Sequence, residues 1–268
     1  MAAVSQALVD FANHHRQPAA PGIHVVATER YQVTLQPDFP APGPNSVTYI
    51  RCEAAQADDL IRDVRGIVAP HRLPVYWIVD PETQPPDFAE YLARHDITFD
   101  SEVAVMVLPV DTSIENHEVA GLQIHDALAE PEAFRTADDV NSEAFGSFAR
   151  DADSQERRRT NQLAAGNRRL LLATVEGEPA GSAGLSLFPP IAAIINGGAV
   201  LPKFRGRGVY RAMVAARLAM ARGAGIEGGL AVWGGEMSAP ILERLGFETV
   251  GWRKFYLDTS AAPRDEQR

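Results

Sequence analysis

Cysteine is almost absent from this chain of 268 residues, in which Cys52 is the single one. One cysteine excludes an intramolecular disulfide and alone cannot supply a structural zinc site, so we expect Cys52 to be a small core residue. A run of about 18 apolar residues is also absent, which excludes a membrane-spanning helix. Residues 1–16 include Asp10 and no unbroken apolar stretch, unlike a signal peptide. We therefore expect a cytoplasmic protein that has no membrane partner.

Positive charge is the second scarcity, because 25 lysines and arginines against 35 aspartates and glutamates leave a formal net charge of -10. Binding a duplex relies on neutralising several phosphates with clustered cations, so nucleic acid is not an expected partner. An anionic ligand needs a local positive site instead. One cluster around two glycines offers it: Lys203, Arg205, Arg207 and Arg211. A second cluster at residues 157–159 lies in a polar helical stretch and is interpreted as a solvated face.

The histidines do not have the spacing of metal ligands, so no metal is predicted. Four of them are scattered along the chain: His71, His95, His117 and His125. The adjacent pair His14 and His15 belongs to an N-terminus that we expect to be mobile.

Hydrophobic periodicity in the first half indicates helix, strand, helix, strand. These elements are Asp58–Ala69, Val75–Val79, Pro86–Arg94 and Val103–Leu108, after strand-like alternation in Gly22–Leu35 and proline-rich turns at 17–22 and 37–44. The same order returns in residues 208–257, which favours an internal duplication, with chance similarity of two α/β segments as the alternative. The expected boundaries are an N-terminal segment with a proline-rich linker (1–44), a first half (45–110), a linker (111–120), a second half (121–258) and a flexible tail (259–268).

The second half predicts more strands and a longer helix. Its strands are expected at Leu122–Ile124, Leu170–Val175, Ala180–Leu187, Ile191–Leu201, Leu230–Trp233 and Val250–Leu257. Its helices are expected at Pro131–Phe148, at Ser154–Ala165, from Val209 to about Gly223, and from a capping Ser238 to Gly246. Gly197 and Gly198 stand inside a strand, where glycine often marks a bulge or a close approach of a ligand to the backbone.

The loop at residues 200–211 joins that strand to the long helix, whose first amides and dipole favour an anion. Its glycines let phosphate oxygens approach the backbone, and the flanking cations add charge-assisted hydrogen bonds. A surface turn with solubilising arginines is the alternative. No Walker A sequence is present, and a dinucleotide fingerprint fails because Arg211 stands at the place of its third glycine. We interpret the loop as a pyrophosphate cradle.

This loop resembles motif A of the GNAT acyltransferases, Val-x-Pro-x-x-Arg-x-x-Gly-x-Gly/Ala, and residues 238–247 resemble their motif B. The element order from Leu122 to Leu257 is similar too, so the resemblance covers about half of the chain. It implies a mixed central sheet with flanking helices, and an acetyl-CoA-dependent transferase that moves the acetyl group to a primary amine of a small molecule in a ternary complex. The first half resembles a truncated, degenerate repeat of tandem-GNAT proteins. A homodimer is left open.

The resemblance also implies a set of residues that bind the co-substrate. Backbone groups of Gly198, Ala199 and Val200 would pair with the pantetheine arm, and the amide of Val200 or Leu201 would donate to the thioester oxygen. The pyrophosphate would be held by Arg205, Gly206, Arg207, Gly208, Val209, Tyr210 and Arg211. Tyr210 departs from the motif, which prefers glycine or alanine there, so its side chain must point away from the phosphate.

Two family positions for proton transfer are changed in this chain. Leu242 stands where many members carry a tyrosine acid, and Ile194 where several carry a glutamate base. Substitutes are predicted from position: Asn196, Glu236, Ser238 and Tyr256, with Trp233 expected in the core rather than in the acceptor pocket. The missing acid and base favour a second hypothesis, a catalytically impaired CoA-binding or regulatory module.

Overall fold

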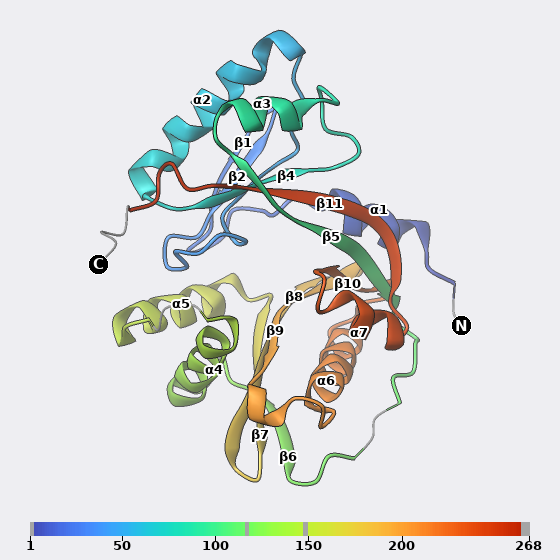
Figure 1. The fold of residues 1–268 in the computed structure, drawn as a ribbon. Helices are drawn as coiled ribbons and strands as arrows, with labels where there is room; N and C mark the ends of the chain where they lie inside the picture. The colour runs from blue at the N-terminus through green and yellow to red at the C-terminus, as the bar shows by residue number, and fades with distance from the viewer. Residues whose placement is uncertain (1–2, 116–117, 147–149, 264–268) are drawn as a thin grey trace. The chain divides into compact units, whose positions relative to one another are not determined.

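The computed structural model describes residues 3–115, 118–146 and 150–263. These residues form two compact units, each made of two stretches of chain. We call residues 1–15 with 105–251 unit 1, and residues 16–104 with 252–268 unit 2 (Figure 1). The boundaries expected from the sequence enclose contiguous stretches of chain. In the structure, unit 1 also contains the N-terminal segment 1–15, and unit 2 also contains the C-terminal segment 252–268. His117, Phe148 at the expected helix end, and residues 264–268 of the expected tail lie outside the described residues.

Unit 1 is built on a mixed sheet, as the family resemblance implied, and its strand order is β5-β10-β9-β8-β7-β6. Its strands are β5 (Thr98–Pro109), β6 (Leu122–Asp126), β7 (Arg168–Val175), β8 (Glu178–Phe188), β9 (Ala192–Val200), β10 (Gly229–Gly234) and the first residues of β11 (Glu248–Asp258). Neighbours from β6 to β9 pair antiparallel, and β9 pairs parallel with β10. Parallel neighbours separated by a helical crossover are the arrangement in which a ligand site at strand ends is common.

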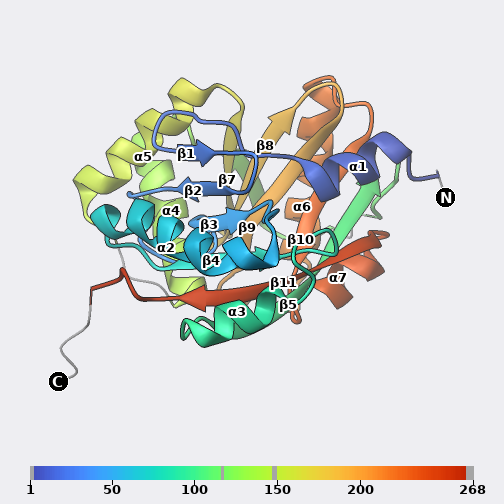
Figure 2. The same cartoon turned by 90° about the horizontal axis from the view of Figure 1, so that it is seen from above.

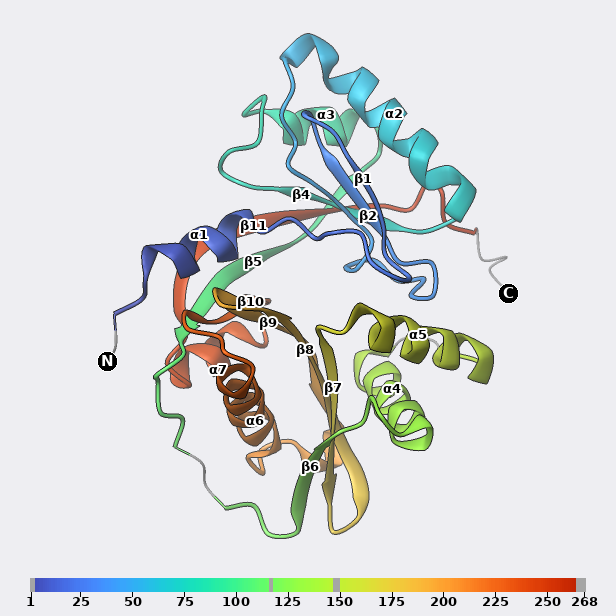
Figure 3. The ribbon, with the colours of Figure 1, turned by 180° about the vertical axis from the view of Figure 1, so that it is seen from behind.

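Helices cover both faces of this sheet. They are α4 (Pro131–Phe145), α5 (Ala152–Ala165), α6 (Val209–Gly223) and α7 (Ala239–Arg244), with a short 3-10 turn at Pro202–Phe204. Figure 3 shows α4 and α5 on one face of β7 to β9 and α6 on the other. The core between the sheet and these helices includes Ala137 of α4, Leu171 of β7 and Met213 of α6. The 3.6-residue apolar period of α6 explains why it packs along one side.

The N-terminus forms a helix, α1 (Gln6–His14), so the expectation of a mobile terminus was wrong. The hydroxyl of Ser5 accepts a hydrogen bond from the amide of Leu8 at 3.3 Å, which caps the helix. Leu8 is fully buried in a cluster with Val105 and Ala231, and the ring of His15 stacks on Phe11 at 4.5 Å. This burial fixes the segment in place. Its apolar face was not recognised in the sequence because polar residues stand between the apolar ones.

Unit 2 contains the strand order β1-β2-β3-β4-β11-β5, which Figure 2 shows from above. Its elements are β1 (His24–Ala27), β2 (Gln32–Leu35), β3 (Ser46–Thr48), a 3-10 turn at Ala54–Gln56, α2 (Ala57–Val68), a 3-10 turn at Ala69–His71, β4 (Val75–Val79) and α3 (Phe88–Arg94). The predicted helix, strand, helix, strand order is therefore confirmed here. The core gathers Leu60, Trp77 and Phe88, and the partly buried Cys52 packs against it.

Buried polar groups in unit 2 are paired. Asp258 accepts hydrogen bonds from Arg65 at 2.9 Å and from the Trp77 indole at 3.3 Å. Hydrogen bonds from Arg65 and Ser260 outweigh burial and lower the pKa of Asp258. Among the helices of the described residues, none is long and apolar enough to cross a membrane.

Candidate acyl-CoA site

The two parallel strands of unit 1 part from each other before they end. Pairing between β9 and β10 extends from Ala192–Gly229 to Ile194–Ala231. Beyond that point β9 continues to Val200 and β10 continues to Gly234. Since β8 still pairs with β9 as far as Val200, the backbone edge of β9 that loses its partner is the one that faced β10. This edge can pair with another extended, amide-bearing molecule.

A bulge follows the point of separation. Ser182 pairs with Ala199 and Gly184 with Asn196, so two residues of β9, Gly197 and Gly198, oppose one residue of β8. Gly197 has a φ of +54°, which favours glycine. From α4, the side-chain amide of Asn141 donates to the Gly197 carbonyl at 2.7 Å. The bulge predicted from the two glycines is thus present and is held from the α4 side.

The direction of the backbone amides after the bulge distinguishes the two candidates for the hydrogen bond to the thioester oxygen, Val200 and Leu201. The amide of Leu201 donates to the carbonyl of Ala180 at 2.9 Å, so it is occupied by the first residues of β8. Successive amides of a strand point to opposite edges, so the amide of Val200 points away from β8. By the same alternation Gly198 faces the open edge and Ala199 faces β8. The geometry therefore favours Gly198 and Val200 over Ala199 and Leu201 as contacts for a bound thioester and its arm.

The loop after β9 presents unused amides at the start of α6. Gly208, with a φ of +87°, is the N-cap residue and provides no side-chain cap. Regular helical bonding begins with the amide of Ala212, which donates to the Gly208 carbonyl at 3.0 Å. Within the described residues, the amides of residues 206–211 donate no backbone hydrogen bond. A helix N-terminus in this state is suited to bind phosphate.

The basic side chains of the loop border this N-terminus. Arg205 donates to the Val200 carbonyl at 3.1 Å, and Arg211 donates to the Glu115 carbonyl at 3.4 Å. The Arg207 guanidinium lies 5.4 Å from the centre of the Phe204 ring. Lys203 forms an exposed ion pair with Glu178, which lowers the pKa of that carboxyl. The arginines of the predicted cluster thus lie against the loop and the segment at Glu115, whereas Lys203 pairs with Glu178.

Comparison with known proteins decides the family of this region. Residues 134–247 match the model of the acetyltransferase (GNAT) family. Residues 134–247 form a GNAT acetyltransferase domain. Membership in this family supports acyl transfer. Among curated proteins no match was found.

Solved structures share the GNAT fold over most of this chain. A GCN5-related N-acetyltransferase from Kribbella flavida is 17% identical with a TM-score of 0.63, over 88% of this chain and 90% of the other. A functionally unknown conserved protein from Staphylococcus epidermidis ATCC 12228 is 14% identical with a TM-score of 0.67, over 95% and 99%. A tandem GNAT protein from the clavulanic acid biosynthesis pathway is 15% identical with a TM-score of 0.59, over 96% and 89%. At these identities the likeness is one of fold.

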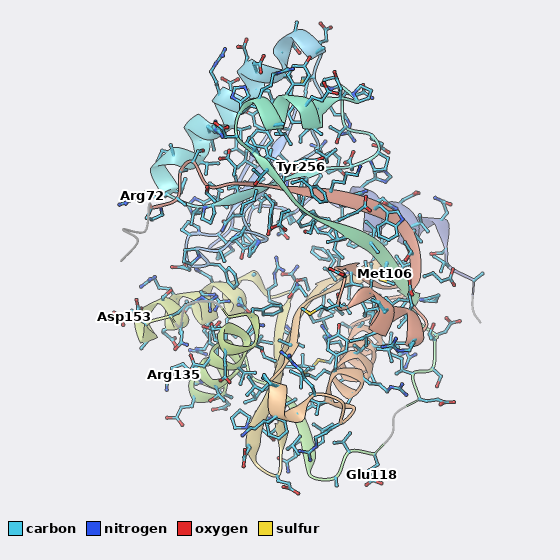
Figure 4. All side chains as sticks on the ribbon, in the orientation of Figure 1. Arg72, Met106, Glu118, Arg135, Asp153 and Tyr256 are labelled. Atoms are coloured by element: carbon cyan, nitrogen blue, oxygen red, sulfur yellow. The ribbon has the colours of Figure 1, made fainter. Side chains whose placement is uncertain are left out.

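Residues predicted for proton transfer lie in different parts of the GNAT domain and of unit 2. Asn196 is exposed beside the bulge, and its side-chain amide donates to the Ser186 hydroxyl at 3.3 Å. Glu236 is exposed in the loop between β10 and α7. Tyr256 lies on β11, opposite Trp77 of β4 in unit 2 (Figure 4), where burial raises the pKa of its phenol.

Two expectations for the loop around α7 were wrong. Ser238 is the N-cap residue of α7, but its φ of -95° and ψ of -33° are helical and its side chain makes no cap hydrogen bond. An extended N-cap conformation is what normally directs the hydroxyl to the first amides, and here Ser238 donates to the Gly235 carbonyl at 3.3 Å instead. Trp233 is 45% exposed rather than in the core, and it lies past the last residue of β10 that pairs with β9.

Two residues beside the bulge were not predicted from the sequence. Asn141 lies on α4, far from the motif in sequence, and no local pattern points to it. Arg217 lies on α6 and is fully buried. The sequence held a signal for Arg217, since an arginine four residues after Met213 falls on the apolar face of the helix.

Proposed function

We propose that the GNAT domain transfers an acetyl group from acetyl-CoA to a primary amine of a small molecule, by direct attack within a ternary complex. The observation that carries this proposal is the separation of β9 from β10 just before the bulge. It leaves the Gly198 and Val200 backbone groups along an open strand edge. That edge leads directly to the unused amides of the loop before α6.

In this proposal each part of acyl-CoA has its own contacts along β9 and the loop that follows it. The amides of residues 206–211 would hold the pyrophosphate, with Arg205, Arg207 and Arg211 adding positive charge. The amide-bearing pantetheine arm would pair with the open edge of β9 as a short extra strand. The thioester oxygen would then accept a hydrogen bond from the Val200 amide, which stabilises the negative charge that forms there during attack.

Proton transfer needs another residue, because the side chain of Leu242, which stands at the place of the family's tyrosine, has no ionisable proton and is buried. A simple thiol has a pKa near 8.5, so the thiolate is already a fair leaving group near neutral pH. Glu236 would take the proton of the amine, directly or through water, while Asn196 orients the amine. Ser238 and Tyr256 are the further candidates for a proton relay.

Replacing Glu236 by alanine should lower turnover by at least about tenfold and leave the affinity for CoA within about threefold, because the phosphate loop lies elsewhere in the domain. Steady-state rates with a good amine measure the first effect, and calorimetry measures the second. Glu243→Ala is the matched control, since Glu243 is an exposed glutamate of the adjacent α7. Ser238→Ala, Asn196→Ala and Tyr256→Phe complete the series. Should all four keep wild-type turnover, protonation by solvent replaces the proposed side-chain base and relay.

The buried Leu242 also favours a second candidate, a CoA-binding or regulatory module without catalysis. Release of free thiol from acetyl-CoA, followed with a thiol reagent over a panel of small primary amines, separates the two. The proposed function predicts release that depends on the amine and on folded protein. Tight binding of CoA without release for any amine would favour the regulatory module.

A further inference from the structure

Arg217 carries a buried guanidinium with an unused hydrogen-bond donor. The residue lies in the middle of α6 and is 1% exposed. Its Nε donates to the Met213 carbonyl at 3.1 Å, and its Nη1 makes a long contact of 3.4 Å with the Gly184 carbonyl of β8. Its buried Nη2 has no hydrogen-bond partner among the described residues. A buried donor in that state is costly unless something else accepts from it.

The unused donor lies against the bulge of β9. A Cβ placed on Gly198 would come within 3.3 Å of Nη2 of Arg217 and within 3.1 Å of Cε2 of Tyr210. Gly198 is the bulge residue whose backbone faces the open edge of β9. The guanidinium therefore supports, from the α6 side, the strand segment at which the thioester is proposed to bind, while Asn141 holds Gly197 from the α4 side.

The charge of Arg217 is not neutralised by a carboxylate within the described residues. The elements around it contribute backbone from β8 and β9 and the Tyr210 phenol from α6. Burial lowers the pKa of Arg217 to about 10, and the neighbouring Tyr210 opposes this shift. The guanidinium is accordingly protonated at neutral pH, which places a cation in a medium of low dielectric constant, where its effect on a nearby negative charge is strong.

We propose that Arg217 is a positioning residue for acyl transfer, which fixes the β9 bulge from the α6 side and whose positive charge favours the negative charge formed on the thioester oxygen. This inference rests on the proposed function. In that reaction the amine nitrogen bonds to the carbonyl carbon, and the carbonyl π electrons move to the oxygen. The proton of the attacking nitrogen passes to Glu236, directly or through water. The C=O bond then re-forms, and the C–S bond breaks with its electrons leaving on the thiolate. The charge on oxygen exists only between these steps, so the charge of Arg217 acts on the rate, whereas its support of the bulge acts on the binding of acetyl-CoA.

Replacing Arg217 by methionine should lower kcat/KM for acetyl-CoA by about 100-fold, the effect of losing one preorganised group that stabilises such an oxyanion. Arg217→Lys keeps a charge and should recover at least about tenfold of that loss near pH 7. Arg222→Met is the control on the same helix. It removes a guanidinium that donates to the Val110 and Thr112 carbonyls, both at 2.7 Å, and it should stay within about threefold of wild type.

The pH dependence of the rate distinguishes an effect of the Arg217 charge from an effect of its packing. A buried lysine has a lowered pKa, so the ratio of the Arg217→Lys rate to the wild-type rate should fall as pH rises from 7 to 9.5. Wild type keeps its charge up to a pKa of about 10. A loss with methionine of less than about threefold, or a lysine ratio that does not change with pH, would overturn the proposal.

Binding measurements distinguish a failure of this proposal from a failure of the proposed function. Arg217→Met should weaken acetyl-CoA by about tenfold in calorimetry, because the bulge is no longer fixed. The same variant should bind adenosine 3′-phosphate 5′-diphosphate, which lacks the pantetheine arm and the thioester, within about threefold of wild type. If wild type releases no thiol with any amine, the proposed function fails. The effect of the Arg217 charge on transfer then fails with it, and unchanged acetyl-CoA affinity in Arg217→Met would in addition overturn the role of Arg217 in fixing the bulge.

Discussion

Replacing Gly208 by valine should weaken CoA binding by about 1,000-fold. Gly208 has a φ of +87°, a conformation that a β-branched residue adopts only with strain, and its added Cβ would lie 3.2 Å from Val119. Valine would rotate the peptide groups that open α6 and place methyl groups where phosphate oxygens approach. Losing two charge-assisted hydrogen bonds of about 1.5–3 kcal/mol each corresponds to this factor. Isothermal titration with CoA measures the effect.

Gly225→Val is the control for backbone strain. Gly225 follows the C-terminus of the same helix, has a φ of +78°, and a Cβ there would meet no atom within 4 Å. The two variants should therefore lose comparable stability in thermal melts, and only Gly208→Val should lose CoA. Equal CoA affinity in both variants would show that the start of α6 does not hold the phosphates.

Replacing Asp138 by alanine should destabilise unit 1 by about 3–5 kcal/mol, because it leaves two arginines without their carboxylate. The Asp138 side chain is 3% exposed, and it pairs with Arg150 at 3.1 Å and with Arg158 of α5. Gln155 also donates to it at 3.3 Å. The carboxylate thus joins α4, which carries Asn141, to α5. Melting should occur about 10 °C lower, measured by circular dichroism.

The control for this variant is Glu132→Ala in the same helix. Glu132 is 94% exposed and lies 3.7 Å from Arg135, a surface pair worth less than about 1 kcal/mol. A change of less than about 1 kcal/mol for Asp138→Ala would mean that water solvates the arginines in the variant. The network would then contribute little to holding α4 against α5.

The phosphate loop could be predicted from the sequence because its signals are local. Glycines, arginines and the strand before them are adjacent in the chain, and the bulge is marked by Gly197 and Gly198. The order of elements followed from hydrophobic periodicity for the same reason. The strand β4 and the helix α2 were placed within a residue or two of their observed ends.

Contacts between distant segments could not be predicted in this way. Nothing near Asn141 indicates that it reaches Gly197, 56 residues later. The C-terminal segment belongs to unit 2 because β11 pairs there with β4, for example Tyr256 with Trp77. Such pairing between distant strands leaves no local signal in the sequence. Arg217 was missed for a different reason, since a charged side chain on an apolar helix face is normally taken as solvated, and here it is fully buried.

The start of the first helix of unit 2 should repel phosphate. Asp58 and Asp59 lie in the first turn of α2, and Glu53 and Gln56 form a capping box at the turn before it. Negative charge and satisfied amides both disfavour an anion there. Each chain should therefore have a single CoA site, which lies in unit 1.

Calorimetric titration of the full chain with CoA tests the central claim most directly, namely that the open edge of β9 and the start of α6 hold the co-substrate. The account predicts one site per chain, and at about 100 times the dissociation constant a stabilisation of roughly 2.7 kcal/mol in a parallel melt. NAD should give neither heat nor stabilisation. Absence of both with millimolar CoA, together with a clear response to NAD, would contradict it.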